Sequence, residues 1–189
     1  MKKLVIFLVL ILLAAPFAFA DLLLDEGFEG GTIPAGWTVM DEGDDGDVWF
    51  VYNSADYAYT GDYAAAVACY SSSDAANDWL ITPQLSLRDD DWLGFWARSW
   101  YSTEDFEVRL STTGTAPEDF TVTLASETAG ETYLQYTYDL SAYAGQDCHL
   151  AIVWYFDNYA LLVDDVMVGS YNTVGNEGAS WGGVKALYR

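Results

Sequence analysis

Phe106-Glu107-Val108-Arg109-Leu110 and Phe120-Thr121-Val122-Thr123-Leu124 are the two stretches that decide the fold class of this chain. In both, apolar and polar side chains alternate residue by residue, which is the period of a β-strand with one buried side and one solvent-facing side. The stretch between them, residues 112–117, contains Gly and Pro. The pattern therefore predicts two half-buried strands joined by a turn.

Similar short apolar runs continue on both sides of this pair, separated by clusters of Gly, Asp, Ser and Pro, and no stretch has the period of an amphipathic helix. Further strands are predicted at 22–28, 36–40, 47–52, 63–70, 78–87, 91–101, 132–140, 148–157 and 161–169. Many short strands at regular spacing favour an all-β fold, an antiparallel β-sandwich of jelly-roll type.

The first 20 residues have the features of a secretory signal peptide. Lys2 and Lys3 precede an apolar run that ends at Phe17, and Ala18-Phe19-Ala20 fits a cleavage site. The apolar run is shorter than the roughly 20 residues that cross a bilayer, which disfavours a retained membrane anchor. We expect an exported protein, either secreted or held at the cell surface.

The rest of the chain is predicted to contain one domain, residues 21–169, because its length suits a single core. A polar Gly- and Asn-rich linker is expected at 170–180, followed by a short tail at 181–189. The tail resembles the aromatic and basic C-terminal tails of some exported bacterial proteins, where sorting or anchoring is supposed. The alternatives are a frayed end or an end that docks on the acidic domain.

The charge balance excludes several classes of partner. Seven lysines and arginines stand against 29 acidic residues, a formal net charge of −22. A surface this acidic repels nucleic acids and anionic membranes. Cationic partners, divalent cations and neutral glycans stay compatible with it.

An acidic loop, Asp41-Glu42-Gly43-Asp44-Asp45-Gly46-Asp47, offers closely spaced carboxylates on a backbone that glycines allow to curl. Oxygen ligands in such an arrangement suit Ca²⁺. The loop lacks the closing Glu and the flanking helices of an EF-hand, and the alternative is a solvated acidic turn. Two other acidic groups, at 25–29 and 164–165, lie on segments with strand character, where carboxylates need a partner or a cation.

Strand alternation over residues 92–100 places Trp92, Trp96 and Trp100 on one face and the smaller apolar residues on the other. If the tryptophan face is exposed, it would form a platform on which sugar rings stack, and jelly-roll domains do serve as lectins. The alternative is that these tryptophans fill a second layer or lie beneath a loop.

Cys69 and Cys148 are the only cysteines, and export would permit a disulfide between them. The alternative is two small core residues. The single histidine, His149, has no nucleophile motif or zinc signature beside it. We therefore predict that the chain is not an enzyme.

Five strings occur in an order that resembles a known family. They are Asp25-Glu26-Gly27-Phe28-Glu29, Ile33-Pro34-Ala35-Gly36-Trp37, Asp47-Val48-Trp49, Asn77-Asp78-Trp79-Leu80-Ile81-Thr82-Pro83 and Val163-Asp164-Asp165-Val166. Together they resemble the cleaved adhesin domain, also called the choice-of-anchor J domain, of bacterial surface proteins including the adhesin regions of gingipains. Three of the strings also resemble the MAM domain of animal receptors.

The resemblance implies a jelly-roll sandwich with structural calcium, an adhesive or protein-binding role and no active site. It implies that Glu29, Asp165 and the 41–47 loop converge on one cation. The ligands expected from the loop are Asp41, Asp44, Asp45 and Asp47.

The sequence therefore favours an extracellular adhesin-type module that binds a protein or matrix partner. A carbohydrate-binding module that uses Trp92, Trp96 and Trp100 is one alternative. A structural component of the cell envelope is another.

Overall fold

The structure is a computed structural model that describes residues 21–44, 46–69, 76–155 and 159–170. The predicted signal peptide, the tail at 181–189 and residues 171–180 of the predicted linker lie outside these described residues. Within them the chain forms strands and two single-turn 3₁₀ helices, at Pro117–Asp119 and Ser141–Tyr143. The strands are β1 (Asp21–Glu26), β2 (Thr38–Asp41), β3 (Phe50–Asn53), β4 (Tyr63–Ala68), β5 (Asn77–Ile81), β6 (Leu85–Ser86), β7 (Asp91–Ser99), β8 (Glu104–Ser111), β9 (Val122–Ala129), β10 (Leu134–Asp139), β11 (Asp147–Tyr155) and β12 (Ala160–Ser170).

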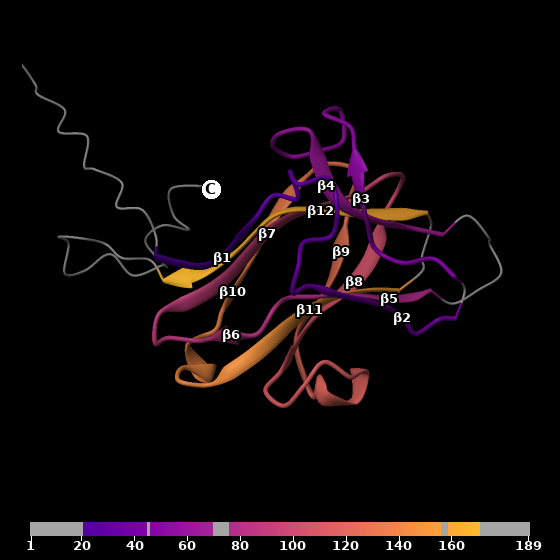
Figure 1. Cartoon of the computed structure of the whole chain (residues 1–189). Helices are drawn as coiled ribbons and strands as arrows, with labels where there is room; N and C mark the ends of the chain where they lie inside the picture. The colour runs from indigo at the N-terminus through magenta and orange to yellow at the C-terminus, as the bar shows by residue number, and fades with distance from the viewer. Residues whose placement is uncertain (1–20, 45, 70–75, 156–158, 171–189) are drawn as a thin grey trace, which may run out of the picture. The chain divides into compact units, whose positions relative to one another are not determined.

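Two antiparallel sheets of six strands face each other (Figure 1). The first sheet has the order β10-β7-β12-β4-β3, and β1 also pairs with β12. The second sheet has the order β2-β5-β11-β8-β9, and β6 also pairs with β11. The predicted antiparallel β-sandwich is confirmed.

The long strand β12 changes partner along its length. Residues 160–163 pair with β4, whereas residues 166–170 pair with β1. The register of β12 against β7 shifts between Asp164 and Met167, and Asp165 has a left-handed φ of 47°. This bulge gathers the end of β1, the start of β4 and two carboxylates at one place.

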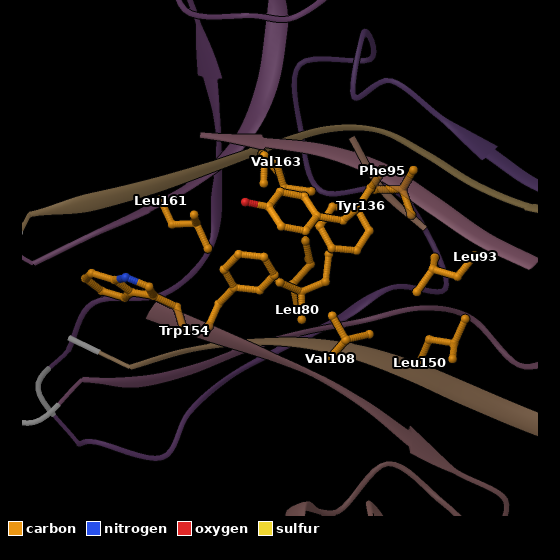
Figure 2. Close-up of a cluster of buried hydrophobic side chains, with 14 of the residues drawn as sticks. Leu80, Leu93, Phe95, Val108, Tyr136, Leu150, Trp154, Leu161 and Val163 are labelled. Carbon is orange, nitrogen blue, oxygen red and sulfur yellow. The ribbon is translucent and has the colours of Figure 1, made fainter. Parts of the chain in front are cut away.

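The core lies between the two sheets (Figure 2). Every second residue of the central strands points into it, as the sequence period requires. Phe95 from the first sheet and Phe106 from the second meet there with ring centroids 6.0 Å apart, and Tyr136 packs against both. Other members from the two sheets are Leu80, Leu93, Val108, Leu150, Trp154, Leu161 and Val163.

All eleven predicted strands have a counterpart, with one correction. The predicted strand at 78–87 is two strands, β5 and β6, because Pro83 has no backbone N–H to donate. Thr82 at the break exchanges hydrogen bonds with Leu150: its own N–H donates to the Leu150 carbonyl, and its Oγ1 accepts from the Leu150 N–H.

Cys69 and Cys148 are both buried in the core, and the structure places no bond between them. Cys69 follows β4 and hydrogen-bonds to the Tyr159 carbonyl, whereas Cys148 lies at the start of β11. Burial and nearby carboxylates raise the pKa of the Cys148 thiol to about 12. Both residues behave as small core side chains.

No helix among the described residues is long and apolar enough to cross a membrane.

Candidate binding site

The outer face of β7 is aromatic, as the alternation predicts. Leu93, Phe95 and Ala97 point into the core. Trp96 and Trp100 point the other way, away from the second sheet, and both are half-buried. Trp92 is 7% exposed, and its indole lies over Gly94, where a Cβ atom would come within 2.1 Å of the ring.

Residues 54–62, between β3 and β4, cover this face. Tyr59 stacks on Trp96 with ring centroids 3.9 Å apart and an interplanar angle of 14°. Tyr57 stacks on Trp100 at 4.3 Å and 28°. Trp96 and Trp100 therefore lie beneath a loop and Trp92 is buried, which corresponds to the alternative to an exposed tryptophan platform. The physical reason is that the loop supplies tyrosines whose faces replace water over the indoles.

The solvent-facing ring of this layer is Tyr59. Its side chain is 39% exposed, and its second aromatic neighbour, Tyr133, meets it edge-on at 5.4 Å. The Tyr133 hydroxyl donates to the Tyr57 carbonyl at 2.8 Å. The Arg98 guanidinium lies 5.5 Å from the Tyr57 ring centroid and 5.8 Å from that of Tyr133, so a cation–π contact joins the two.

Three carboxylates accept hydrogen bonds from residues 59–63, at the end of the segment that covers the tryptophans. Asp164 Oδ2 accepts from the backbone N–H groups of Tyr59, at 2.8 Å, and Thr60, at 3.2 Å. Asp165 Oδ1 accepts from Thr60 Oγ1 at 2.9 Å. Glu29 accepts from the backbone N–H groups of Asp62 and Tyr63. The carboxylates on strand segments were predicted to need partners, and backbone N–H groups together with the Thr60 hydroxyl are those partners.

Two glycines make this approach of carboxylates and backbone feasible. A Cβ atom on Gly61 would lie 2.2 Å from Glu29 Oε1, and Gly61 also has a left-handed φ of 64°. A Cβ atom on Gly27 would lie 3.2 Å from Asp165 Oδ1 and 4.0 Å from both Asp164 Oδ1 and Glu29 Cγ. Asp164 and Asp165 therefore approach the backbone of Gly27 with their carboxylates and Glu29 approaches it with its Cγ atom, whereas the Glu29 carboxylate lies against Gly61.

Asp164 and Asp165 are costly to ionise in this position. Burial raises the pKa of Asp164 to about 6, although three backbone N–H bonds oppose the rise. Burial also raises the pKa of Asp165, and the negative charges of Asp25 and Glu29 add to it. The ion pairs found among the described residues, Arg88 with Asp21 and Asp91 and Arg109 with Glu107, lie elsewhere. A cation at this cluster would lower the electrostatic cost.

The acidic loop at 41–47 belongs to the second sheet, because Asp41 is the last residue of β2. Asp41 Oδ2 accepts from the Gly46 N–H at 2.8 Å, Asp44 is exposed and Asp47 half-buried. Asp45 lies outside the described residues. Within the described ranges no three carboxylate, imidazole or thiol groups lie close enough to hold one metal ion together. The convergence of this loop with Glu29 and Asp165 stays a prediction.

His149 takes part in the fold. Its Nδ1 lies 2.9 Å from the Thr82 carbonyl, which fixes the imidazole against the break between β5 and β6. Nothing about this contact suggests a catalytic dyad with Cys148, which points into the core.

The site residues that sequence reasoning missed are Tyr57, Tyr59 and Tyr133. Tyr57 and Tyr59 lie between the predicted strands 47–52 and 63–70, in a stretch for which the sequence pattern predicted no packing partner. The signal that was available is their spacing of two: two turn tyrosines separated by one residue match the spacing of outward residues on a strand.

Two facing antiparallel sheets with this aromatic outer layer define the class of protein as a β-sandwich domain. Within that class the chain belongs to the cleaved adhesin family, since the Cleaved Adhesin Domain model matches residues 22–168. The predicted family is confirmed.

Relatives and solved structures agree with this assignment. Hemagglutinin A of Porphyromonas gingivalis is 33% identical over 178 residues, which cover 77% of this chain and 7% of that protein. The K1 cleaved adhesin domain of Lys-gingipain from Porphyromonas gingivalis W83 is 27% identical, with a TM-score of 0.69, over 78% of this chain and 97% of the domain.

A carbohydrate-binding module, TmCBM61 in complex with β-1,4-galactotriose, shares the fold alone. It is 14% identical, with a TM-score of 0.52, over 76% of this chain and 94% of that chain.

Proposed function

We propose that this chain is a non-catalytic adhesin-type binding module, secreted or held at the cell surface, that binds an extracellular protein or glycan through the outer face of its first sheet. The observation that carries the proposal is the Tyr59–Trp96 stack: an aromatic ring held at the surface by Asp164 and left 39% exposed. Exposed aromatic rings held in place are typical of binding hot spots.

The family supports this proposal. Members named for haemagglutination and adhesion contain the same domain, although this chain spans 7% of the length of Hemagglutinin A, so that protein's activity is carried over only as a hypothesis. The galactotriose bound by TmCBM61 makes a glycan one of the two ligand classes to test.

The test is direct binding of the full chain, in millimolar calcium, to a panel of extracellular matrix proteins and to a glycan array. We expect saturable binding on at least one panel. Two blank panels together with self-association in sedimentation would overturn the proposal and favour a structural component of a surface layer.

We also propose that the module carries a structural calcium ion held by Glu29 and Asp165. The fit rests on the crowding around Gly27, where Asp164 and Asp165 have a raised pKa and the described ion pairs bring no lysine or arginine. A hard divalent cation prefers such carboxylate oxygens. Bound there, calcium would supply positive charge that fixes the end of β1 against the bulge of β12.

The 41–47 loop is the second part of the calcium proposal. Asp41, Asp44, Asp45 and Asp47 would serve as ligands, either to the same ion or to one of their own. Calorimetric titration with calcium of the full chain and of its Asp47→Ala and Asp165→Asn variants separates the two arrangements. If the wild type binds two ions and each variant still binds one, the loop and the Glu29–Asp165 cluster hold separate ions. If the wild type binds one ion and neither variant binds any, the loop and the cluster share that ion.

A further inference from the structure

We infer that the open face of Tyr59 is a stacking subsite for a pyranose ring of an uncharged glycan, an inference that rests on the binding function proposed above. In this arrangement Tyr59 contacts the ligand, and Trp96 stacks on the other face of the Tyr59 ring and holds it in place.

The geometry of the ring shows which surface is offered. Trp96 covers one face of Tyr59 at 3.9 Å and nearly parallel, and Tyr133 closes one edge at 5.4 Å. Tyr59 is nevertheless 39% exposed as a residue. Because Trp96 and Tyr133 occupy one face and one edge of the ring, we assign the exposed surface to the ring face opposite Trp96.

The ring is held in position before any ligand arrives. Asp164 accepts from the N–H groups of Tyr59 and Thr60, and the Ser54 N–H donates to the Asp62 carbonyl at 2.9 Å, which closes the base of the loop. The Tyr133 hydroxyl fixes the loop at the Tyr57 carbonyl. A ligand that stacks on Tyr59 therefore loses little affinity to ordering of the protein.

The chemistry around the ring suits a sugar. The electron-rich face of an aromatic ring attracts the weakly positive C–H groups of a pyranose. Thr60 is exposed next to it, and its hydroxyl, which donates to Asp165 Oδ1, can accept a hydrogen bond from a sugar hydroxyl group. Polar groups of this kind orient a ligand that an apolar surface binds.

Charge narrows the class of glycan. The chain has a formal net charge of −22, and Glu29, Asp164 and Asp165 lie under the same loop. Glycans that carry sulfate, uronate or sialic acid groups would be repelled. Uncharged pyranose polymers bear no such cost.

Other exposed rings lack this support. Tyr101 is 59% exposed and lies tilted at 52° against Tyr159, with centroids 5.6 Å apart. Phe50 is 37% exposed and meets Tyr52 edge-on at 6.5 Å. Tyr101 therefore provides a matched control: an exposed tyrosine with no parallel ring behind it.

The experiment is a glycan array probed with the full chain, followed by titration of the best uncharged oligosaccharide into the wild type and the Tyr59→Ala, Tyr59→Phe and Tyr101→Ala variants. We expect Tyr59→Ala to weaken binding about tenfold or more and Tyr59→Phe to retain it, since the ring carries the contact. Tyr101→Ala should bind as the wild type does. Saturation-transfer NMR on the wild type should show transfer from aromatic protons to the C–H groups of one sugar face, which tests stacking without a variant.

The outcomes separate this inference from the binding function. Glycan binding that Tyr59→Ala leaves unchanged, or a preference for acidic glycans, overturns the Tyr59 subsite and leaves the module a binding protein. A blank glycan array with binding to a matrix protein does the same. Blank results on both panels overturn the binding function as well.

Discussion

The outer faces of both sheets carry aromatic, arginine and acidic side chains, but these side chains are packed differently on the two faces. On the second sheet Trp79 is covered by Phe120, with centroids 5.3 Å apart, and by the Arg109 guanidinium at 5.0 Å. Arg109 is neutralised by Glu107 at 2.7 Å, and Trp79 is 2% exposed. This face forms a closed second core together with Ile81, Ala151 and Val153.

On the first sheet the aromatic layer ends at an exposed ring, Tyr59, and the nearby acids Asp164 and Asp165 are held by backbone N–H and hydroxyl donors. The difference teaches that aromatic content alone does not identify a binding face. An exposed tyrosine and two carboxylates with a raised pKa distinguish the first face from the second, where the aromatic side chain is fully covered.

The largest expected loss of unfolding free energy is that of Trp79→Ala, which tests whether the second face is a packed core. Because Trp79 is fully packed, its removal should cost about 3–5 kcal/mol of unfolding free energy. Trp96→Ala should cost less, because Trp96 is half-buried, yet it should remove the support of Tyr59 and weaken ligand binding. Urea unfolding of both variants measures the ranking, and an equal or reversed ranking would break the distinction between the faces.

The calcium ion proposed at Glu29 and Asp165 should stabilise the folded state at the first face. If the folded state alone binds the ion, a hundredfold excess over Kd adds about 3 kcal/mol to the unfolding free energy. Thermal melts of the full chain in millimolar calcium and in EDTA, followed by tryptophan fluorescence, measure this. Asp165→Asn should reduce the calcium response, and abolish it if a single ion is bound, whereas Glu107→Gln on the second face should keep the full response. Coincident wild-type melts would contradict the calcium proposal.

The pH dependence should also originate at the first face. The pKa of Asp164 is raised by burial to about 6, above its ordinary value of 3.8, so between these values the folded state holds more protons than the unfolded state. In EDTA, stability should therefore rise, on the order of 1–2 kcal/mol, as pH falls from 7 towards 5. The calcium-dependent rise in Tm should shrink over the same interval, because protons compete for the carboxylates.

Asp164→Asn is the variant that tests the source of this pH dependence. It should flatten the EDTA profile between pH 5 and 7, while Asp105→Asn, on the second sheet, should leave it unchanged. An unchanged slope in Asp164→Asn would assign the pH dependence to the overall negative charge of the chain.

The smallest effect is expected from Tyr101→Ala. Its side chain is 59% exposed, so the change in unfolding free energy should stay within about 0.5 kcal/mol. Tyr59→Ala should cost somewhat more, about 1 kcal/mol, because it removes the stack on Trp96. A destabilisation by Tyr59→Ala as large as that by Trp79→Ala would mean that the first face is a core like the second.

The candidate site was only partly predictable from the sequence. Alternation over residues 92–100 correctly predicted that Trp96 and Trp100 share a face, since a strand permits no other arrangement. It could not predict what covers them, because Tyr59 comes from a loop that is 37 residues away from Trp96 in the sequence. Similarly, the acidic strings predicted that Glu29 and Asp165 need partners, whereas the donors, Asp62, Tyr63 and Thr60, were not foreseen.

The sequence by itself determined the fold class, the family and the direction of each strand side chain, because these depend on local period and on strings of neighbouring residues. Only the tertiary structure decided which aromatic residue is exposed, that β12 bulges at Asp164 and Asp165, and that Cys69 and Cys148 are both buried in the core. The physical reason is that exposure, charge compensation and contact depend on long-range pairing of strands and loops. A sequence of period two leaves that pairing unspecified.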